Sequence, residues 1–186
     1  MPVVLASAAY FLLAVLLLAA VTSDVRARRI PNQLIVTGLG CAAFAHVLAA
    51  AASTAPLAGP SWWSPLAGLA AGLLLMLPLH LLRAMGAGDV KLMAMVGAFI
   101  GAPAVLDATL YTLLAGGLLS LVFMVAQGVA SQTLANVRFI LTDWSVRAAN
   151  GQGARLAPLQ TTAARLPYAV AIALGTGAAL IWPLSA

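Results

Sequence analysis

The chain has 186 residues, of which 63% are hydrophobic and only 7% are charged. A soluble domain usually carries about 25% charged residues, so this composition excludes an ordinary water-soluble protein and indicates a lipid bilayer as the solvent. The single cysteine, Cys41, excludes an internal disulfide and any paired-cysteine zinc site. The net charge of +5 is better explained by membrane topology than by nucleic-acid binding, as the placement of the basic residues indicates.

Long apolar runs without alternation predict membrane-spanning helices and not a β-barrel, because lipid requires every backbone N–H and C=O group to be paired within the chain. A spanning helix needs about 20 apolar residues. The sequence therefore predicts a single all-α domain over residues 1–186, a polytopic integral membrane protein with about six transmembrane helices. We expect them at 3–23, 34–52, 66–82, 90–106, 109–129 and 166–184.

An even number of helices would place both termini on one side of the membrane. All nine Lys and Arg residues would then lie on the other side, after the first helix, around the connection 83–91 or in the segment 130–165. The positive-inside rule assigns that side to the cytoplasm, so we expect both termini in the periplasm. The outer connections would carry a single charge, Asp107, which is expected to lie in a turn.

The segment 130–165 is the only long polar part of the chain and is predicted to be a cytoplasmic connector. Leu134, Val137, Leu141 and Trp144 recur at helical spacing, which fits an amphipathic helix lying on the inner leaflet. A disordered connector fits the composition equally well, and both interpretations stay open.

Only four acidic residues exist, and the expected topology sorts them. Asp24 ends the first helix and Asp89 begins the fourth, both on the cytoplasmic side, whereas Asp143 lies in the connector. Two carboxylates at one depth of a bundle can face each other and share a proton. In aspartic proteases one carboxylate takes a proton from water while its protonated partner polarises the scissile carbonyl. Asp24 and Asp89 are therefore a candidate catalytic pair.

Each of these two aspartates also has a structural interpretation. Asp89 could cap the N-terminus of its helix, and Asp24 could pair with Arg28 on the next turn. Taken singly, either interpretation is reasonable. Their joint placement at one end of the bundle favours the catalytic one.

Residues around the two aspartates are candidates for substrate binding or support. Gly86 and Gly88 precede Asp89, and glycine permits a positive φ and close backbone approach, so an extended peptide could pair with this segment. Pro31 and Asn32 are expected to shape the start of the second helix, and Asn32 could also contact substrate. Lys91 is expected to extend to the lipid headgroups, with stabilisation of negative charge near the carboxylates as a second interpretation.

Three motifs together resemble those of the type IV prepilin peptidases. GAGD, at Gly86 to Asp89, resembles the GxGD motif of membrane aspartyl proteases, and GAGDVKLMAMVGAFIG is similar to the same stretch of prepilin peptidases over its whole length. DVRARRIPNQLI, which starts at Asp24, resembles the first aspartate motif of that family. RLPYAVAIALG resembles its Pro-aromatic motif and adds Pro167 as a supporting residue. The motifs occur in the family order.

The resemblance implies a GxGD membrane aspartic endopeptidase that removes the short basic leader from prepilin-like or pseudopilin proteins, just before their apolar helix. It implies the cytoplasmic face of the bacterial inner membrane, Asp24 and Asp89 as the catalytic pair, and no cofactor. The chain lacks the cysteine-bearing insert of the two-function members, so methyl transfer is not expected. The short form is similar to the peptidases of tight-adherence (Flp) pili and to archaeal preflagellin peptidases.

Two histidines lie within the predicted helices, His46 in the second and His80 near the inner end of the third. An intramembrane histidine can be a metal ligand or a proton relay. Because no cysteine or carboxylate lies at ligand spacing, no metal site is expected and both are interpreted as packed polar residues. His80 is the one expected nearer to the carboxylates.

Two other classes of function are considered beside the prepilin peptidase. A non-enzymatic protein, such as a small transporter or an assembly subunit, would use its acids to bind protons or ions. A transporter predicts polar groups near the bilayer midplane and an internal repeat, neither of which the sequence favours. A presenilin-type GxGD protease would pair GxGD with a Tyr-Asp dipeptide, which neither Tyr10 nor Asp24 forms.

Overall fold

The structure is a computed structural model that describes residues 2–53, 58–59, 61–82, 85–128 and 167–184, with short stretches between 131 and 146. The chain forms two compact units. The main unit contains residues 1–116 and 167–186, and the second unit contains residues 117–166. The predicted connector 130–165 falls in the second unit and lies largely outside the described residues, so the choice between an interfacial helix and a disordered segment stays a prediction.

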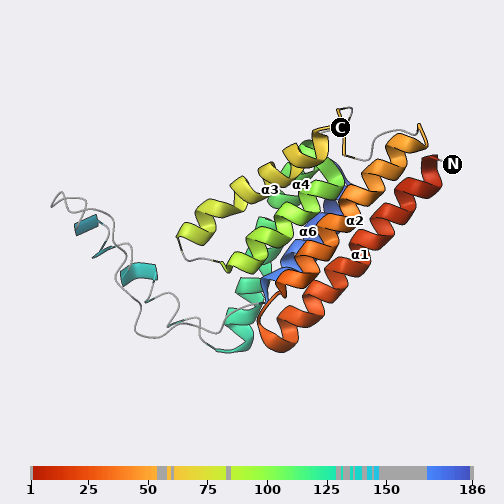
Figure 1. The fold of residues 1–186 in the computed structure, drawn as a ribbon. Coiled ribbons are helices and arrows are strands. Elements are labelled where there is room, and N and C mark those ends of the chain that lie inside the picture. Colours follow the sequence, from red (N-terminus) through yellow and green to blue (C-terminus); the bar gives the residue numbers. More distant parts are fainter. Residues whose placement is uncertain are drawn as a thin grey trace. The chain divides into compact units, whose positions relative to one another are not determined.

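The regular secondary structure of the described residues is entirely helical. The helices are α1 (Pro2–Ala27), α2 (Asn32–Ala51), α3 (Ser64–Leu81), α4 (Ala87–Ala126) and α6 (Tyr168–Ile181) (Figure 1). Four of them, α1 to α4, are long and apolar enough to cross a membrane, and α6 is an apolar helix of 14 residues. The predicted all-α, polytopic membrane class is therefore confirmed.

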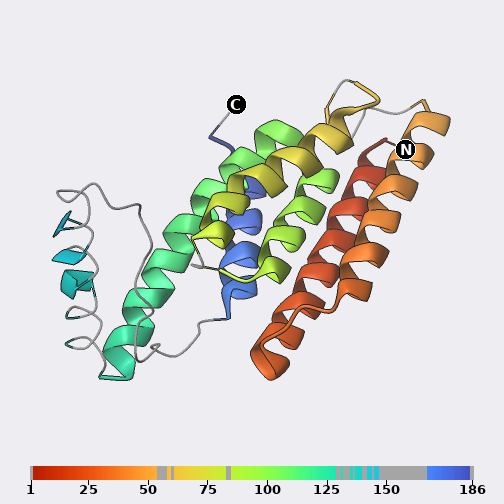
Figure 2. The same cartoon turned by 60° about the vertical axis from the view of Figure 1, so that its left-hand side comes forward.

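Helix α4 consists of two helical arms, because the helix is interrupted by a non-helical residue, Gly101. This residue has φ 82° and ψ 173°, and Pro103 follows it. Proline has no N–H group to donate to the preceding turn, and a positive φ of this kind is open to glycine alone. The chain reverses at this point, so that residues 102–116 return beside residues 87–100 (Figure 1 and Figure 2). We call residues 87–100 the first arm and residues 102–126 the second arm.

The prediction of a turn at Asp107 is wrong. Asp107 lies inside the second arm, where it is only 4% exposed. Its Oδ2 atom accepts a hydrogen bond of 3.0 Å from the backbone N–H of Leu184, just beyond the end of α6. The carboxylate therefore pairs with the chain after the last helix, a role that its position in an apolar run does not reveal.

The first arm forms the centre of the main unit, and residues 92–101 are all buried. Glycines let neighbouring helices approach it closely, as is common where helices pack in membranes. A Cβ atom added to Gly68 of α3 would overlap the carbonyl oxygen of Gly97, and the reverse also holds. A Cβ at Gly72, one turn further along α3, would overlap the carbonyl of Met93. The first arm thus packs backbone to backbone against α3.

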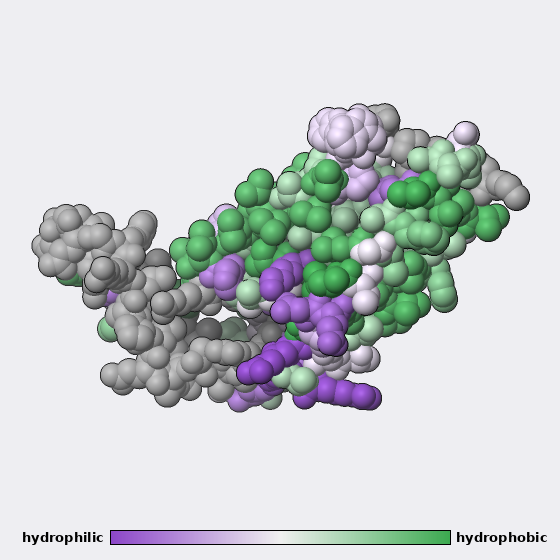
Figure 3. Space-filling model, viewed as in Figure 1, coloured by the Kyte–Doolittle hydropathy of each residue, from purple (hydrophilic) through white to green (hydrophobic). Residues whose placement is uncertain are grey.

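The outer sides of the helices carry the hydrophobic residues that a bilayer requires. Large apolar side chains such as Phe11, Leu74 and Leu114 are more than half exposed. Figure 3 shows hydrophobic residues covering the sides of the helices, while hydrophilic residues gather toward one end. The beginning of α1 and the end of α6 are both at the opposite end of the main unit (Figure 1).

Candidate active site

The polar end of the main unit brings five helix ends together. The end of α1, the beginning of α2, the end of α3, and the beginnings of α4 and α6 meet there through side-chain contacts and hydrogen bonds described below. The described basic residues of the main unit also lie at this end and are exposed. They are Arg26, Arg28, Arg29 and Lys91. Helix ends of this kind offer unpaired backbone groups, which polar side chains can bind.

Asp24 occupies the last turn of α1, which continues three residues past it, and the side chain is only 8% exposed. Its Oδ2 atom accepts a hydrogen bond of 3.1 Å from the backbone N–H of Ala169. Ala169 is the second residue of α6, so its N–H group has no acceptor within that helix. The carboxylate thus caps a helix that begins far along the chain, and the positive end of that helix favours an acid there.

Asp89 is the third residue of α4 and is half-buried. Its Oδ2 atom accepts a hydrogen bond of 3.2 Å from the N–H of Gly86, and its own N–H donates to the carbonyl of Gly86 at 3.2 Å. Gly86 is the N-cap position of α4 and Asp89 is the third helical residue, so these two bonds have the pattern of a capping box. Asp89 therefore caps the N-terminus of α4, and the bond from the Gly86 N–H also fixes the orientation of its carboxylate.

The two carboxylates belong to one cluster. Asp24 and Asp89 lie close enough to interact electrostatically, and the phenol of Tyr168 at the start of α6 interacts with Asp89 in the same way. Ile30, in the connection between α1 and α2, packs against Gly88. Residues separated by 58 or more positions in the sequence therefore meet at one end of the bundle.

The glycines of GAGD lie in close contact with the residues around them. Neither Gly86 nor Gly88 adopts the positive φ that glycine permits. A Cβ atom on Gly86 would lie 3.3 Å from Asp89 Oδ2, and one on Gly88 would lie 3.3 Å from the Cβ of Ile30. Both distances are tighter than ordinary van der Waals contact. The glycines therefore make room for the carboxylate and for the α1–α2 connection.

The supporting residues lie around this cluster. Pro31 is the N-cap of α2, with φ −63° and ψ 134°, and the helix begins at Asn32. Lys91 Nζ donates a hydrogen bond of 3.0 Å to Asn32 Oδ1, which ties the first arm to α2 at an exposed position. Pro167 is the N-cap of α6 and therefore sets the position at which Ala169 presents its N–H to Asp24.

Each histidine bonds with a backbone carbonyl. His80 Nδ1 lies 3.1 Å from the carbonyl oxygen of Met85, directly before the GAGD stretch. His46 Nε2 lies 2.9 Å from the carbonyl of Ala98, three residues before the break at Gly101. A carbonyl only accepts, so the ring nitrogen carries the proton in both cases. Both side chains are packed polar residues, and His80 is the one near the carboxylates.

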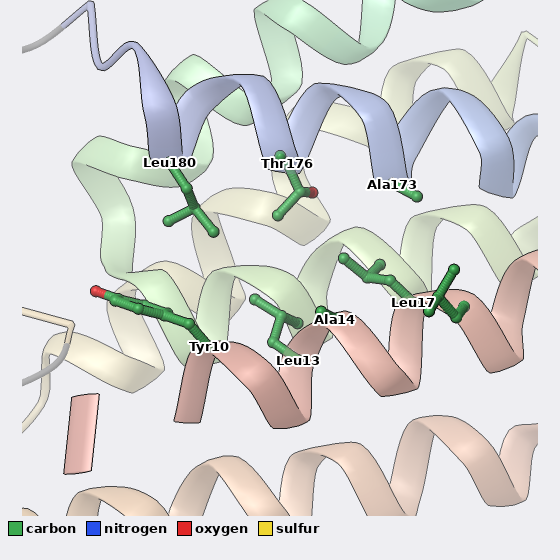
Figure 4. Close-up of a pocket in the computed structure, with 9 residues that line it drawn as sticks. Tyr10, Leu13, Ala14, Leu17, Ala173, Thr176 and Leu180 are labelled. Atoms are coloured by element: carbon green, nitrogen blue, oxygen red, sulfur yellow. The ribbon is translucent and has the colours of Figure 1, made fainter. Parts of the chain in front are cut away.

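A cavity of about 250 Å³ lies between α1 and α6, and neither Asp24 nor Asp89 lines it (Figure 4). Its walls are almost entirely apolar, with side chains such as Leu13, Leu17 and Leu180 pointing into it. Among the described residues, no three His, Cys, Asp or Glu side chains come together in a way that could hold a metal ion. The apolar cavity and the carboxylate cluster are therefore separate features of the main unit.

Sequence reasoning missed two features of this cluster. The N–H of Ala169 is the partner of Asp24, and the carbonyl of Met85 is the partner of His80. The proline before Tyr168 signals a helix start, but no sequence pattern shows which side chain satisfies the N–H groups that follow. Both partners are backbone groups, which explains why a search for side-chain motifs could not find them.

Comparison with protein-family models gives one match. The model described as the type IV leader peptidase family matches residues 11–123. The matched region contains Asp24, Asp89 and the whole GAGD stretch, whereas Pro167 and α6 lie outside it. Comparison with curated proteins and with solved structures gives no match.

Proposed function

This chain belongs to the type IV leader peptidase family, and on that premise we propose that it is an aspartic endopeptidase in which Asp24 and Asp89 are the catalytic pair. The observation that carries the proposal is the meeting of these two carboxylates at one end of the bundle, near enough to interact electrostatically. They are brought there by the end of α1 and the beginning of α4.

The proposed chemistry follows from two neighbouring carboxyl groups. Two nearby carboxylates resist joint ionisation, and the proposed mechanism uses the form in which one member is protonated and the other ionised. The ionised member takes a proton from water, and the water oxygen attacks the scissile carbonyl. The protonated member donates a hydrogen bond to that carbonyl oxygen as negative charge develops on it. When the tetrahedral intermediate collapses, the C–N bond breaks and the carboxyl group that took the proton from water gives it to the leaving amine nitrogen, which restores the starting pair. One oxygen of each carboxyl accepts a backbone N–H bond, which limits how far either group can turn.

The proposed substrate is a prepilin or pseudopilin, with a short basic leader followed by an apolar helix. Its scissile bond would lie at the boundary between water and lipid, because the apolar helix stays in the bilayer. The carboxylate cluster sits at helix ends and beside exposed basic residues, which fits such a boundary. By the positive-inside rule this is the cytoplasmic face of the inner membrane, with both termini in the periplasm.

The exposed backbone at Gly86 supports an extended substrate. Gly86 is exposed and carries no side chain that would hold a peptide away from the backbone. A substrate strand could lie along this turn, close to Asp89, as extended peptides lie along exposed backbone. A helix hides its peptide bonds, so the cleaved segment must be extended when it reaches the carboxylates.

The proposal is tested by cleavage of a prepilin in lipid vesicles by wild type, Asp24→Asn and Asp89→Asn. Each substitution keeps the size of the side chain and removes its acid–base chemistry, so each should lower the cleavage rate by about 10²- to 10⁴-fold. Mass spectrometry of the new N-terminus measures the product. Asp107→Asn, at an aspartate buried in the second arm of α4, is the control and should cleave at the wild-type rate. Wild-type activity in either of the first two variants would overturn the catalytic pair.

A further inference from the structure

The peptide group between Met85 and Gly86 is held at both of its ends. Its carbonyl oxygen lies 3.1 Å from His80 Nδ1, and its N–H donates to Asp89 Oδ2 at 3.2 Å. Because the carbonyl only accepts, His80 donates from Nδ1. One peptide plane therefore connects the imidazole at the end of α3 with the carboxylate at the beginning of α4.

Such a connection acts on the carboxylate in two ways. A hydrogen bond to the carbonyl polarises the whole peptide group, so its N–H becomes a stronger donor to Asp89. The bond also fixes the rotation of the peptide plane, and with it the direction of the N–H. His80 is partly buried in the last turn of α3, whereas Gly86 is exposed and has no side chain to hold it. Met85 packs against the core, and the hydrogen bonds of the peptide group set the direction of its carbonyl and N–H.

We propose that His80 is a positioning residue for Asp89, which it orients through the Met85–Gly86 peptide group. The proposal rests on the proposed function, because it assigns Asp89 the catalytic role. His80 itself touches neither substrate nor water in this scheme. Its removal should leave substrate binding intact and slow the chemical step.

The second histidine provides a matched control. His46 also bonds with a backbone carbonyl, that of Ala98 at 2.9 Å, and it is likewise partly buried. Ala98 lies near the break at Gly101, at the other end of the first arm from Asp89. Replacing His46 therefore removes the same kind of bond without reaching the carboxylate cluster.

The test compares His80→Leu, His80→Asn and His46→Leu with wild type in lipid nanodiscs. His80→Leu should lower kcat about tenfold, because a misplaced catalytic group slows the chemical step. KM should change by less than about twofold, because ground-state binding is retained. His80→Asn should restore kcat, since the Asn side-chain nitrogen is as many bonds from Cα as Nδ1. His46→Leu should keep the wild-type kcat per folded molecule.

A second measurement does not depend on cleavage. In protein labelled with ¹⁵N-glycine, the amide proton of Gly86, assigned by its loss in Gly86→Ala, should move upfield in His80→Leu as its bond to Asp89 weakens. It should stay in place in His80→Asn and in His46→Leu. This readout reports the hydrogen bond itself, whether or not a prepilin is the substrate.

The outcomes separate the two proposals. A wild-type protein that cleaves no prepilin would overturn the proposed function, and the amide resonance would still decide whether His80 controls the Gly86 N–H. An unchanged Gly86 resonance in His80→Leu, or an unchanged kcat, would overturn the positioning role. An equal loss of kcat in His46→Leu would overturn it as well, because the effect would then belong to helix packing in general.

Discussion

The two ends of the first arm of α4 both carry glycines, but they use them differently. At the far end, a Cβ on Gly101 would overlap the backbone carbonyl of Ala58, and the residue has φ 82°. At the GAGD end, the atoms nearest to a Cβ on Gly86 or Gly88 are side-chain atoms, at 3.3 Å, and neither residue has a positive φ. The far end is thus fixed by backbone packing, whereas the GAGD end is shaped around a carboxylate.

Because of this difference, we expect glycine substitutions at one end of the arm to affect stability and those at the other end to affect activity. Backbone atoms cannot move aside without disturbing their own hydrogen bonds, so the far end tolerates no added side chain. Side-chain atoms can shift by a few tenths of an ångström, so the fold should accommodate a small added side chain at the GAGD end. Substitutions at the far end should therefore unfold the protein, and substitutions at the GAGD end should leave it folded but impaired.

The largest effect is expected for Gly101→Ala. The added methyl group would meet the Ala58 carbonyl, and alanine disfavours this backbone conformation, so the free energy of unfolding should fall by about 3 kcal/mol or more. Thermal unfolding in lipid nanodiscs measures the loss. Gly177→Ala in α6 is the control, because no atom lies within 4 Å of its added Cβ. It should stabilise the helix by about 0.5–1 kcal/mol. Similar losses in both variants would contradict the role of backbone packing at Gly101.

A smaller effect is expected at Asp24, where the carboxylate caps α6. Asp24→Ala leaves the buried N–H of Ala169 without its acceptor, which should cost about 1–3 kcal/mol of stability. Asp24→Asn keeps an oxygen at that place and should stay close to wild type in stability while losing activity. The two unfolding midpoints, measured side by side, test the capping bond. Equal stability of the two variants would show that the bond to Ala169 contributes nothing.

The smallest change in stability is expected for Gly86→Ala. The residue is exposed and precedes the helix, so the free energy of unfolding should change by less than about 1 kcal/mol. Cleavage should nevertheless fall about tenfold, because the new methyl group lies 3.3 Å from Asp89 Oδ2 and displaces it. Gly40→Ala, at an exposed site of α2 with open space around its Cβ, is the control. A wild-type cleavage rate in Gly86→Ala would show that the bare backbone is not needed there.

The sequence predicts most of the helical frame because each helix is a continuous apolar run. It also predicts that Asp24 and Asp89 lie at the same end, since both follow from helix count and charge placement. The ends of the individual helices are less well predicted. Helix α1 continues to Ala27 and α4 begins at Ala87, so both aspartates lie inside helices. Polar residues near helix ends lower the apolar signal before the helix itself ends.

The break in α4 shows where sequence reasoning fails. Asp107 is the charged residue in that region, and a charge in an apolar run suggests a turn. The turn is at Gly101 because the reversal needs a backbone conformation that glycine alone adopts readily, and the loop at Ala58 fills the space a side chain would take. Asp107 is paired with Leu184, a contact between residues 77 positions apart. Such a pairing depends on how the helices pack, which local patterns do not encode.

The bond between Asp24 and Ala169 has a consequence for the synthesis of the protein. The two residues are 145 positions apart, so α1 leaves the ribosome long before its partner exists. At about 5–20 residues per second, the wait is about 7 to 29 s. During that time the buried carboxylate lacks the N–H group that fixes it. A nascent chain that has not yet released α6 therefore cannot form the bond between Asp24 and Ala169.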